Sequence, residues 1–110
     1  MERELKPATL LNAMIADEFK RSLNKSQPAR GLAPALQALW WSAKDDWDRA
    51  HEIVMAHEDS DCAWVHAYLH RREGDLPNAR WWYRQAHQPA ATGPLDAEWN
   101  AIVRGLLGEA

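Results

Sequence analysis

The chain has 110 residues, enough for a single domain with one core. Its net charge is −3, and acidic and basic residues are interspersed, which excludes the broad basic surface of a nucleic-acid or anionic-membrane binder. A single cysteine, Cys62, excludes an intrachain disulfide and fits a reducing compartment. No signal-peptide core and no run of roughly 20 apolar residues is present, so we expect a cytoplasmic protein without a membrane partner.

Residues 1–33 are predicted to form an N-terminal helix and a linker. Leu11, Ile15 and Phe19 recur at helical spacing, which predicts an amphipathic helix over residues 8–23. Pro28, Gly31 and further turn residues predict a loop over residues 24–34. The periodicity is compatible both with a helix packed on the rest of the chain and with a separate arm.

Residues 34–110 are predicted to form a helical domain. Helices are expected over residues 34–44, 47–57 and 62–73, after Asp75, and over residues 95–107, with loops at residues 58–61 and 88–94. Pro34 suits a first helical turn, Asp46 and Asp75 suit N-caps, and Gly74 suits a left-handed helix end. No segment alternates with the period of a strand, so the predicted fold class is all-α.

An internal repeat is offset by 29 residues. Asp46, Ala50 and Val54 have the same spacing as Asp75, Ala79 and Tyr83. The motif Gly74-Asp75-x3-Ala79-x3-Tyr83-x2-Ala86 resembles the turn and second helix of a tetratricopeptide (TPR) repeat, although a standard repeat has about 34 residues. This resemblance implies two divergent TPR-like hairpins over residues 34–87, followed by a C-terminal capping helix.

The second hairpin carries another resemblance. The stretch from Ala63 to Asp75, with Asn78, Ala79 and the run from Trp82 to Arg84, is similar to a family of small bacterial proteins of unassigned function. That resemblance implies no reaction and no catalytic residue.

A polar stripe lies on the helix predicted over residues 62–73. Cys62, His66, His70 and Glu73 fall within roughly 80° of one another on a helical wheel. Two imidazoles one turn apart can hold one metal ion, and His51 on the preceding helix is expected to meet His66. The alternative is that His66 and His70 form structural hydrogen bonds with carboxylates such as Asp46, Asp75 or Glu73.

A second set of candidates would contact a partner. Trp and Arg side chains dominate binding hot spots, so an exposed Trp81 beside Arg84, together with Arg71 and Arg80, would suit a protein partner. The alternatives are that Trp81 packs against Trp99 beneath the C-terminal helix and that the arginines pair with neighbouring acids. Most of the seven tryptophans are expected in the core, with an aromatic ligand cage as the alternative.

These patterns favour a non-enzymatic module that binds a protein or peptide partner or a second copy of itself as a homodimer, without a resident cofactor. The alternative is a small metal- or ligand-binding protein or enzyme that uses His51, His66, His70 and Glu73, with a divalent metal. Cys62 beside His66 could act as a nucleophile, but the sequence shows no third group that would orient the histidine. The sequence also lacks a glycine-rich phosphate loop and a two-cysteine metal motif.

Overall fold

The computed structural model describes residues 14–109, and this part of the chain contains helices and no strand. The predicted all-α class is therefore confirmed. The elements are α2 (Ala16–Arg21), η1 (Ser22–Asn24), α3 (Pro34–Ala43), α4 (Trp47–Met55), α5 (Ser60–Arg72), α6 (Leu76–Ala86) and α7 (Leu95–Leu106). Among the described residues, no helix is both long and apolar enough to cross a membrane.

Aspartates determine where three of the helices begin. The carboxylates of Asp46 and Asp75 accept hydrogen bonds from the backbone N–H groups of the third residue in α4 and α6, as predicted for N-caps. Asp59 does the same for Cys62, at 2.8 Å, so α5 begins at Ser60, two residues earlier than expected. Helix α4 ends at Met55, two residues before its predicted end.

The turns of the two hairpins use the same backbone conformation. Gly74, between α5 and α6, has φ of 91°, the left-handed value predicted for it. Asp45, between α3 and α4 and 29 residues earlier, has φ of 62°. An aspartate tolerates this conformation better than most residues do, and its carboxylate is held by Arg72 of α5.

The N-terminal segment packs on the rest of the chain. Helix α2 begins at Ala16, and residues 8–13 of the predicted helix lie outside the described residues. Phe19 is fully buried, with its ring centroid 5.8 Å from that of Trp99 of α7. The indole nitrogen of Trp40 in α3 donates to the hydroxyl of Ser22 at 3.0 Å. Residues 14–33 thus share one core with the helices that follow.

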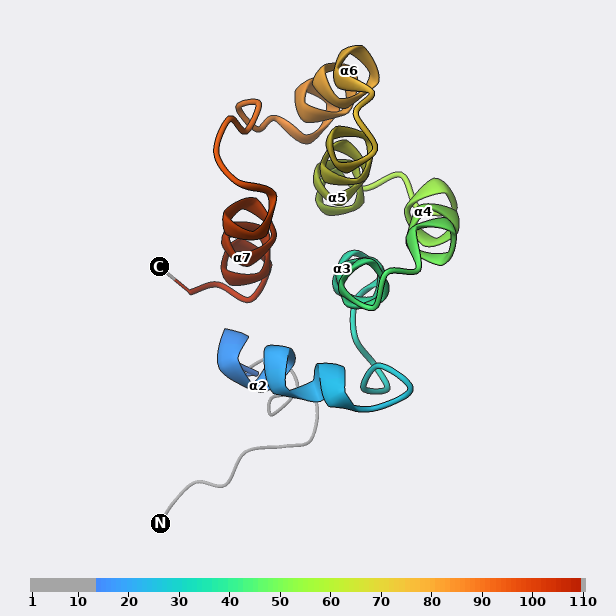
Figure 1. The fold of residues 1–110 in the computed structure, drawn as a ribbon, viewed down its shortest axis with the longest axis vertical. Coiled ribbons are helices and arrows are strands. Elements are labelled where there is room, and N and C mark those ends of the chain that lie inside the picture. The colour runs from blue at the N-terminus through green and yellow to red at the C-terminus, as the bar shows by residue number, and fades with distance from the viewer. Residues whose placement is uncertain (1–13, 110) are drawn as a thin grey trace.

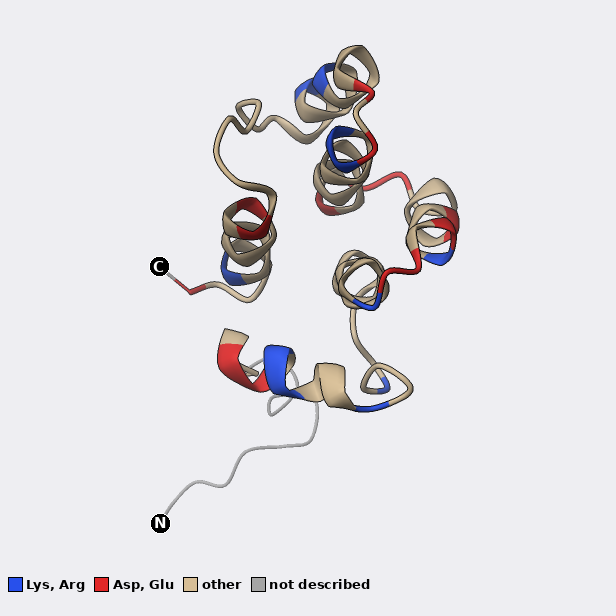
Figure 2. Cartoon of the chain, viewed as in Figure 1, with Lys and Arg blue, Asp and Glu red and all other residues tan. Residues whose placement is uncertain are grey.

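Helices α3 to α6 pack in sequence order, each against the next, while α7 folds back (Figure 1). Helix α7 packs on α5, α3 and α2. The core lies between these helices and includes Trp40 and Trp99, and three further tryptophans, Trp41, Trp47 and Trp64, pack against it while partly buried. Figure 2 shows acidic and basic segments interspersed over the helices, with no face of one sign visible in that view.

Candidate functional site

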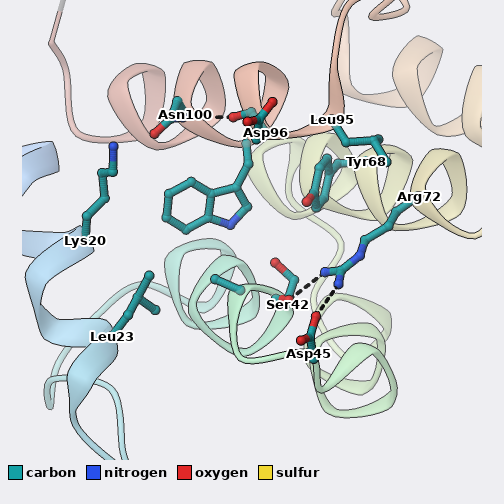
Figure 3. Close-up of a pocket in the computed structure, with 11 residues that line it drawn as sticks. Lys20, Leu23, Ser42, Asp45, Tyr68, Arg72, Leu95, Asp96 and Asn100 are labelled. Carbon is teal, nitrogen blue, oxygen red and sulfur yellow. Dashed lines mark hydrogen bonds and ion pairs between the residues drawn. The ribbon is translucent and has the colours of Figure 1, made fainter.

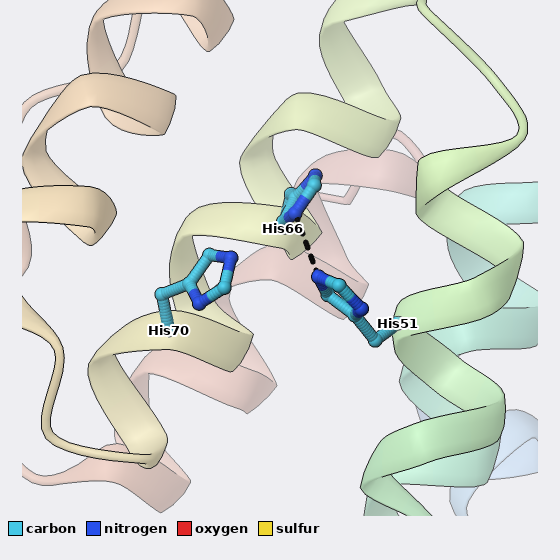
Figure 4. A group of neighbouring side chains, drawn as sticks. All are labelled: His51, His66 and His70. Carbon is cyan, nitrogen blue, oxygen red and sulfur yellow. Dashed lines mark hydrogen bonds between the residues drawn. The ribbon is translucent and has the colours of Figure 1, made fainter.

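Three histidines meet where α4 and α5 pack together. His51 comes from α4, and His66 and His70 come from α5, one turn apart (Figure 4). The ring centroids lie 4.8 Å apart for His51 and His66, 5.2 Å for His51 and His70, and 4.9 Å for His66 and His70. The Nε2 atoms of His51 and His66 are 3.1 Å apart, so the expected contact between these residues is present. We call these three residues the histidine cluster.

The surroundings of His70 define its tautomer. Its Nδ1 is 2.7 Å from Oε2 of Glu73, and a carboxylate can only accept, so Nδ1 carries a hydrogen. In the neutral ring Nε2 then has a lone pair, and the side-chain amide of Asn78 lies 3.3 Å from it as a donor. In Figure 4, His70 turns one ring nitrogen toward the other two histidines.

Two tryptophans form the walls of the histidine cluster. Trp82 of α6 stacks on His66, with centroids 3.8 Å apart and planes 15° apart, and Trp47 of α4 stacks on His51 at 4.6 Å and 15°. The indole nitrogen of Trp47 also donates to the carbonyl of Leu69 at 2.8 Å, which fixes that ring. The cluster is therefore packed from α4, α5 and α6.

Burial favours the uncharged form of His51 and His66. His66 is 1% exposed and His70 is 6% exposed, whereas His51 is partly exposed. Burial, followed by the proximity of His70 and His51, lowers the pKa of His66 to about 3. Burial and the proximity of His70 also lower the pKa of His51. Among the described residues, Nδ1 of His66 is a buried polar atom without a hydrogen-bond partner.

Cys62 does not join the histidine cluster, although it was a member of the predicted stripe. Its side chain is 1% exposed and belongs to the hydrophobic core. Burial, reinforced by the nearby carboxylate of Asp59, raises the pKa of the thiol to about 12. The thiolate needed for nucleophilic attack or metal binding is therefore strongly disfavoured.

The four residues predicted to contact a partner lie in different environments. Trp81 is 45% exposed, and Trp99 packs against Phe19, so the alternative in which Trp81 packs against Trp99 is wrong. Helix α7 packs on α5, α3 and α2, which keeps its tryptophan away from α6. Arg80 and Arg84 are exposed on α6.

Arg71 instead belongs to a buried polar network. It forms an ion pair of 2.8 Å with Glu98 of α7 and donates to the carbonyl of Gly93. The other carboxylate oxygen of Glu98 accepts from the hydroxyl of Tyr83. Glu98 is only 8% exposed, so both partners compensate for a buried charge. This network connects α5, α6, α7 and the loop before α7.

A pocket that the sequence did not indicate lies among α2, η1, α3, α5 and α7 (Figure 3). Its volume is about 380 Å³. We call it the central pocket, and its lining includes Lys20, Leu23, Ala43, Tyr68, Arg72, Trp99 and Asn100. These residues come from separate parts of the chain, so no local motif reveals them. The one local signal is the pair Tyr68 and Arg72, four residues apart on α5.

Comparison with known protein families, with curated proteins and with solved structures found no match for this chain. The resemblance of the hairpins to TPR repeats therefore stays a prediction. Functional inference rests on the geometry of the central pocket and the histidine cluster.

Proposed function

We propose that this protein is a non-enzymatic module of two TPR-like hairpins that binds a peptide segment of a partner protein in the central pocket. The observation that carries the proposal is the pocket itself, which combines aromatic and aliphatic walls with polar groups at its edge. Its volume of about 380 Å³ is within the range of ligand pockets.

Equivalent positions of the two hairpins support a repeat. Ala50 and Ala79 are both buried, at 0% and 1% exposure, where small residues allow paired helices to approach closely. Val54 and Tyr83, one turn later, are also both buried. Together with the paired N-caps and left-handed turns, these features recur at one offset of 29 residues.

The chemistry of the central pocket favours an apolar side chain as its occupant. Trp99, Tyr68 and Leu23 supply apolar surface. The charges of the lining cancel, because two cations, Lys20 and Arg72, face two anions, Asp45 and Asp96. The occupant therefore needs no net charge. Asn100 and Lys20 lie at the edge, where the peptide groups that flank a bound side chain can form hydrogen bonds.

The pocket walls are held in place by bonds within the protein. Arg72 donates to the carbonyl of Ser42 and to the carboxylate of Asp45 (Figure 3). The indole nitrogen of Trp99 donates to the carbonyl of Leu39 at 3.0 Å. A preformed pocket loses little conformational entropy when a ligand binds, which favours affinity.

Selection of a phage-displayed random peptide library against the full chain tests this proposal. We expect enrichment of peptides with a large apolar residue, and loss of their binding in Ala43→Arg, which places a long cation in the pocket from an exposed position. Ala101→Arg is the matched control, because Ala101 is also an exposed helical alanine and does not line the central pocket.

Two outcomes would contradict the proposal: no enriched peptide, or peptides that bind Ala43→Arg as tightly as the wild type. Sedimentation over a concentration series separates a partner peptide from a second copy of the chain. We expect a monomer throughout, and a dimer that Ala43→Arg disrupts would identify the second copy as the occupant.

A further inference from the structure

We propose that His51, His66 and His70 bind one divalent transition-metal ion of the zinc class through their ring nitrogens. This site is separate from the central pocket: it lies where α4, α5 and α6 meet, whereas the pocket lies among α2, α3, α5 and α7. The proposal therefore stands or falls independently of peptide binding.

The distances between the donor atoms are close to those of a metal site. One ring nitrogen from each histidine lies within 4.8 Å of the other two. Metal–nitrogen bonds of about 2.0–2.1 Å in a tetrahedral site place two nitrogens about 3.3 Å apart. The His51 and His66 nitrogens, at 3.1 Å, already satisfy this spacing. His70 has to approach by up to about 1.5 Å to complete the site.

Glu73 prepares His70 for this role. A histidine that binds a metal usually donates its other ring N–H to a carboxylate or carbonyl, which fixes the ring and strengthens the donor. The Nδ1 of His70 makes that bond to Glu73 at 2.7 Å, so in the neutral ring Nε2 carries the lone pair. The single competitor that the described residues show for it is the amide of Asn78, in a long contact of 3.3 Å.

Ligation also suits the other two rings. Between His51 and His66 only one hydrogen bond can form, in which one Nε2 donates its hydrogen and the other accepts with its lone pair. A metal ion would bind the lone pairs of both Nε2 atoms, once the donating ring carries its hydrogen on Nδ1 instead. Among the described residues Nδ1 of His66 has no partner, so ligation at Nε2 loses no bond there. Stacking on Trp82 and Trp47 keeps both rings oriented, and the partly exposed side of His51 leaves room for a fourth ligand from solvent.

The donor set favours a particular class of ion. Three neutral imidazoles bind Zn²⁺, Ni²⁺ or Cu²⁺ in preference to Mg²⁺ or Ca²⁺, which require oxygen ligands. A neighbouring group, His70 with the exposed carboxylates of Glu73 and Asp75, shares one histidine and has to be distinguished by experiment.

The test is calorimetric titration of Zn²⁺ into the untagged full chain after treatment with a chelator, with thermal unfolding in parallel. We expect one Zn²⁺ per chain and a melting temperature raised by about 10 °C when Zn²⁺ exceeds its Kd a hundredfold. His51→Gln, at a partly exposed position, is expected to weaken binding by at least about 100-fold, more than the loss of an outer partner.

Three further variants complete the test. His57→Gln is the matched control, because His57 is exposed and outside the cluster, and it is expected to bind Zn²⁺ as the wild type does. Glu73→Gln is expected to weaken binding by about 10-fold, since it removes only the support of His70. Asp75→Asn keeps an N-cap on α6 and is expected to leave binding unchanged.

The proposal is overturned by the absence of both a binding heat and a thermal shift in the wild type. It is equally overturned if His51→Gln and His57→Gln bind Zn²⁺ alike. Loss of binding in Asp75→Asn, with binding retained in His51→Gln, would assign the ion to the carboxylates instead. Circular dichroism of each variant confirms that a loss of binding is not a loss of fold.

Discussion

The two sides of helix α5 use polar residues in opposite ways. On one side Tyr68 and Arg72 face the central pocket, and on the other side His66 and His70 face α4 and α6. The two pairs are offset by two residues, which is about 200° around a helix. On the pocket side Arg72 is paired with Asp45, whereas the histidine side brings three imidazoles together with a single carboxylate at its edge.

The difference separates charged residues that connect α5 to its neighbours from imidazoles that face one another. Arg71 and Arg72 connect α5 to α7 and to the turn before α4 through charged hydrogen bonds, which are about twice as strong as neutral ones. The histidine cluster contains one bond between two neutral rings and one buried nitrogen without a partner among the described residues. A metal ion bound to the ring nitrogens that face one another would replace this weak bond with coordination bonds.

The first prediction has the largest expected effect and concerns the network of Arg71, Glu98 and Tyr83. Glu98→Ala leaves the buried hydroxyl of Tyr83 without its acceptor and removes the carboxylate that pairs with Arg71, which keeps only its bond to the carbonyl of Gly93. We expect the free energy of unfolding, measured with urea, to fall by about 3–5 kcal/mol. Glu52→Ala, at an exposed position of α4, is the control and should change it by less than about 0.5 kcal/mol. A loss below about 1 kcal/mol for Glu98→Ala would contradict the view that these charged bonds stabilise the fold.

The second prediction uses pH to test the uncharged side. The pKa of His66 is about 3 in the folded chain, whereas the ordinary value of a histidine, 6.5, applies to the unfolded chain. Between these pH values the unfolded chain therefore binds the proton more readily. The contribution of the neutral His66 ring to the free energy of unfolding is therefore complete above pH 6.5 and decreases as the pH falls. We expect the metal-free protein to lose about 1.4 kcal/mol per pH unit on this account, or about 2 kcal/mol at pH 5.

Variants attribute this pH dependence to its source. His66→Gln should flatten the decrease in unfolding free energy between pH 6.5 and 5, because glutamine does not titrate. His57→Gln should retain the decrease, since its side chain is exposed. Equal slopes in the two variants would show that the buried imidazole is not responsible.

The third prediction has the smallest expected effect and concerns the competition between Asn78 and a metal ion for Nε2 of His70. Asn78→Ala removes the amide that contacts Nε2 of His70 at 3.3 Å. This long bond contributes about 0.5 kcal/mol, so its removal should strengthen Zn²⁺ binding by about twofold, measured by the same titration. A weaker affinity would indicate that Asn78 supports the bound ion instead of competing with it.

Local signals account for the parts of the fold that the sequence predicted. Caps and turns depend on a few neighbouring residues, so Asp46, Asp75 and Gly74 could be assigned without knowledge of the packing. The helix boundaries that were wrong by two residues have a local cause as well. Asp59 caps α5 before the predicted start, where several residues capable of capping follow one another.

The candidate sites were predictable to different degrees. His66 and His70 share a face because of helical periodicity, and α4 packs on α5 as expected for consecutive helices. The contact of His66 with His51 was therefore predictable. The position of Cys62 in the core did not follow, because a helical wheel describes directions and not neighbours. The central pocket was not predicted, since its residues meet only after α7 folds back.

The sequence by itself determined the helices, their caps and the histidine stripe, because each depends on spacing within one or two turns. The tertiary structure alone decided the path of α7, the burial of Glu98 with Arg71 and the exposure of Trp81. These features depend on which distant surfaces exclude water from one another, and that depends on the summed burial of the whole chain.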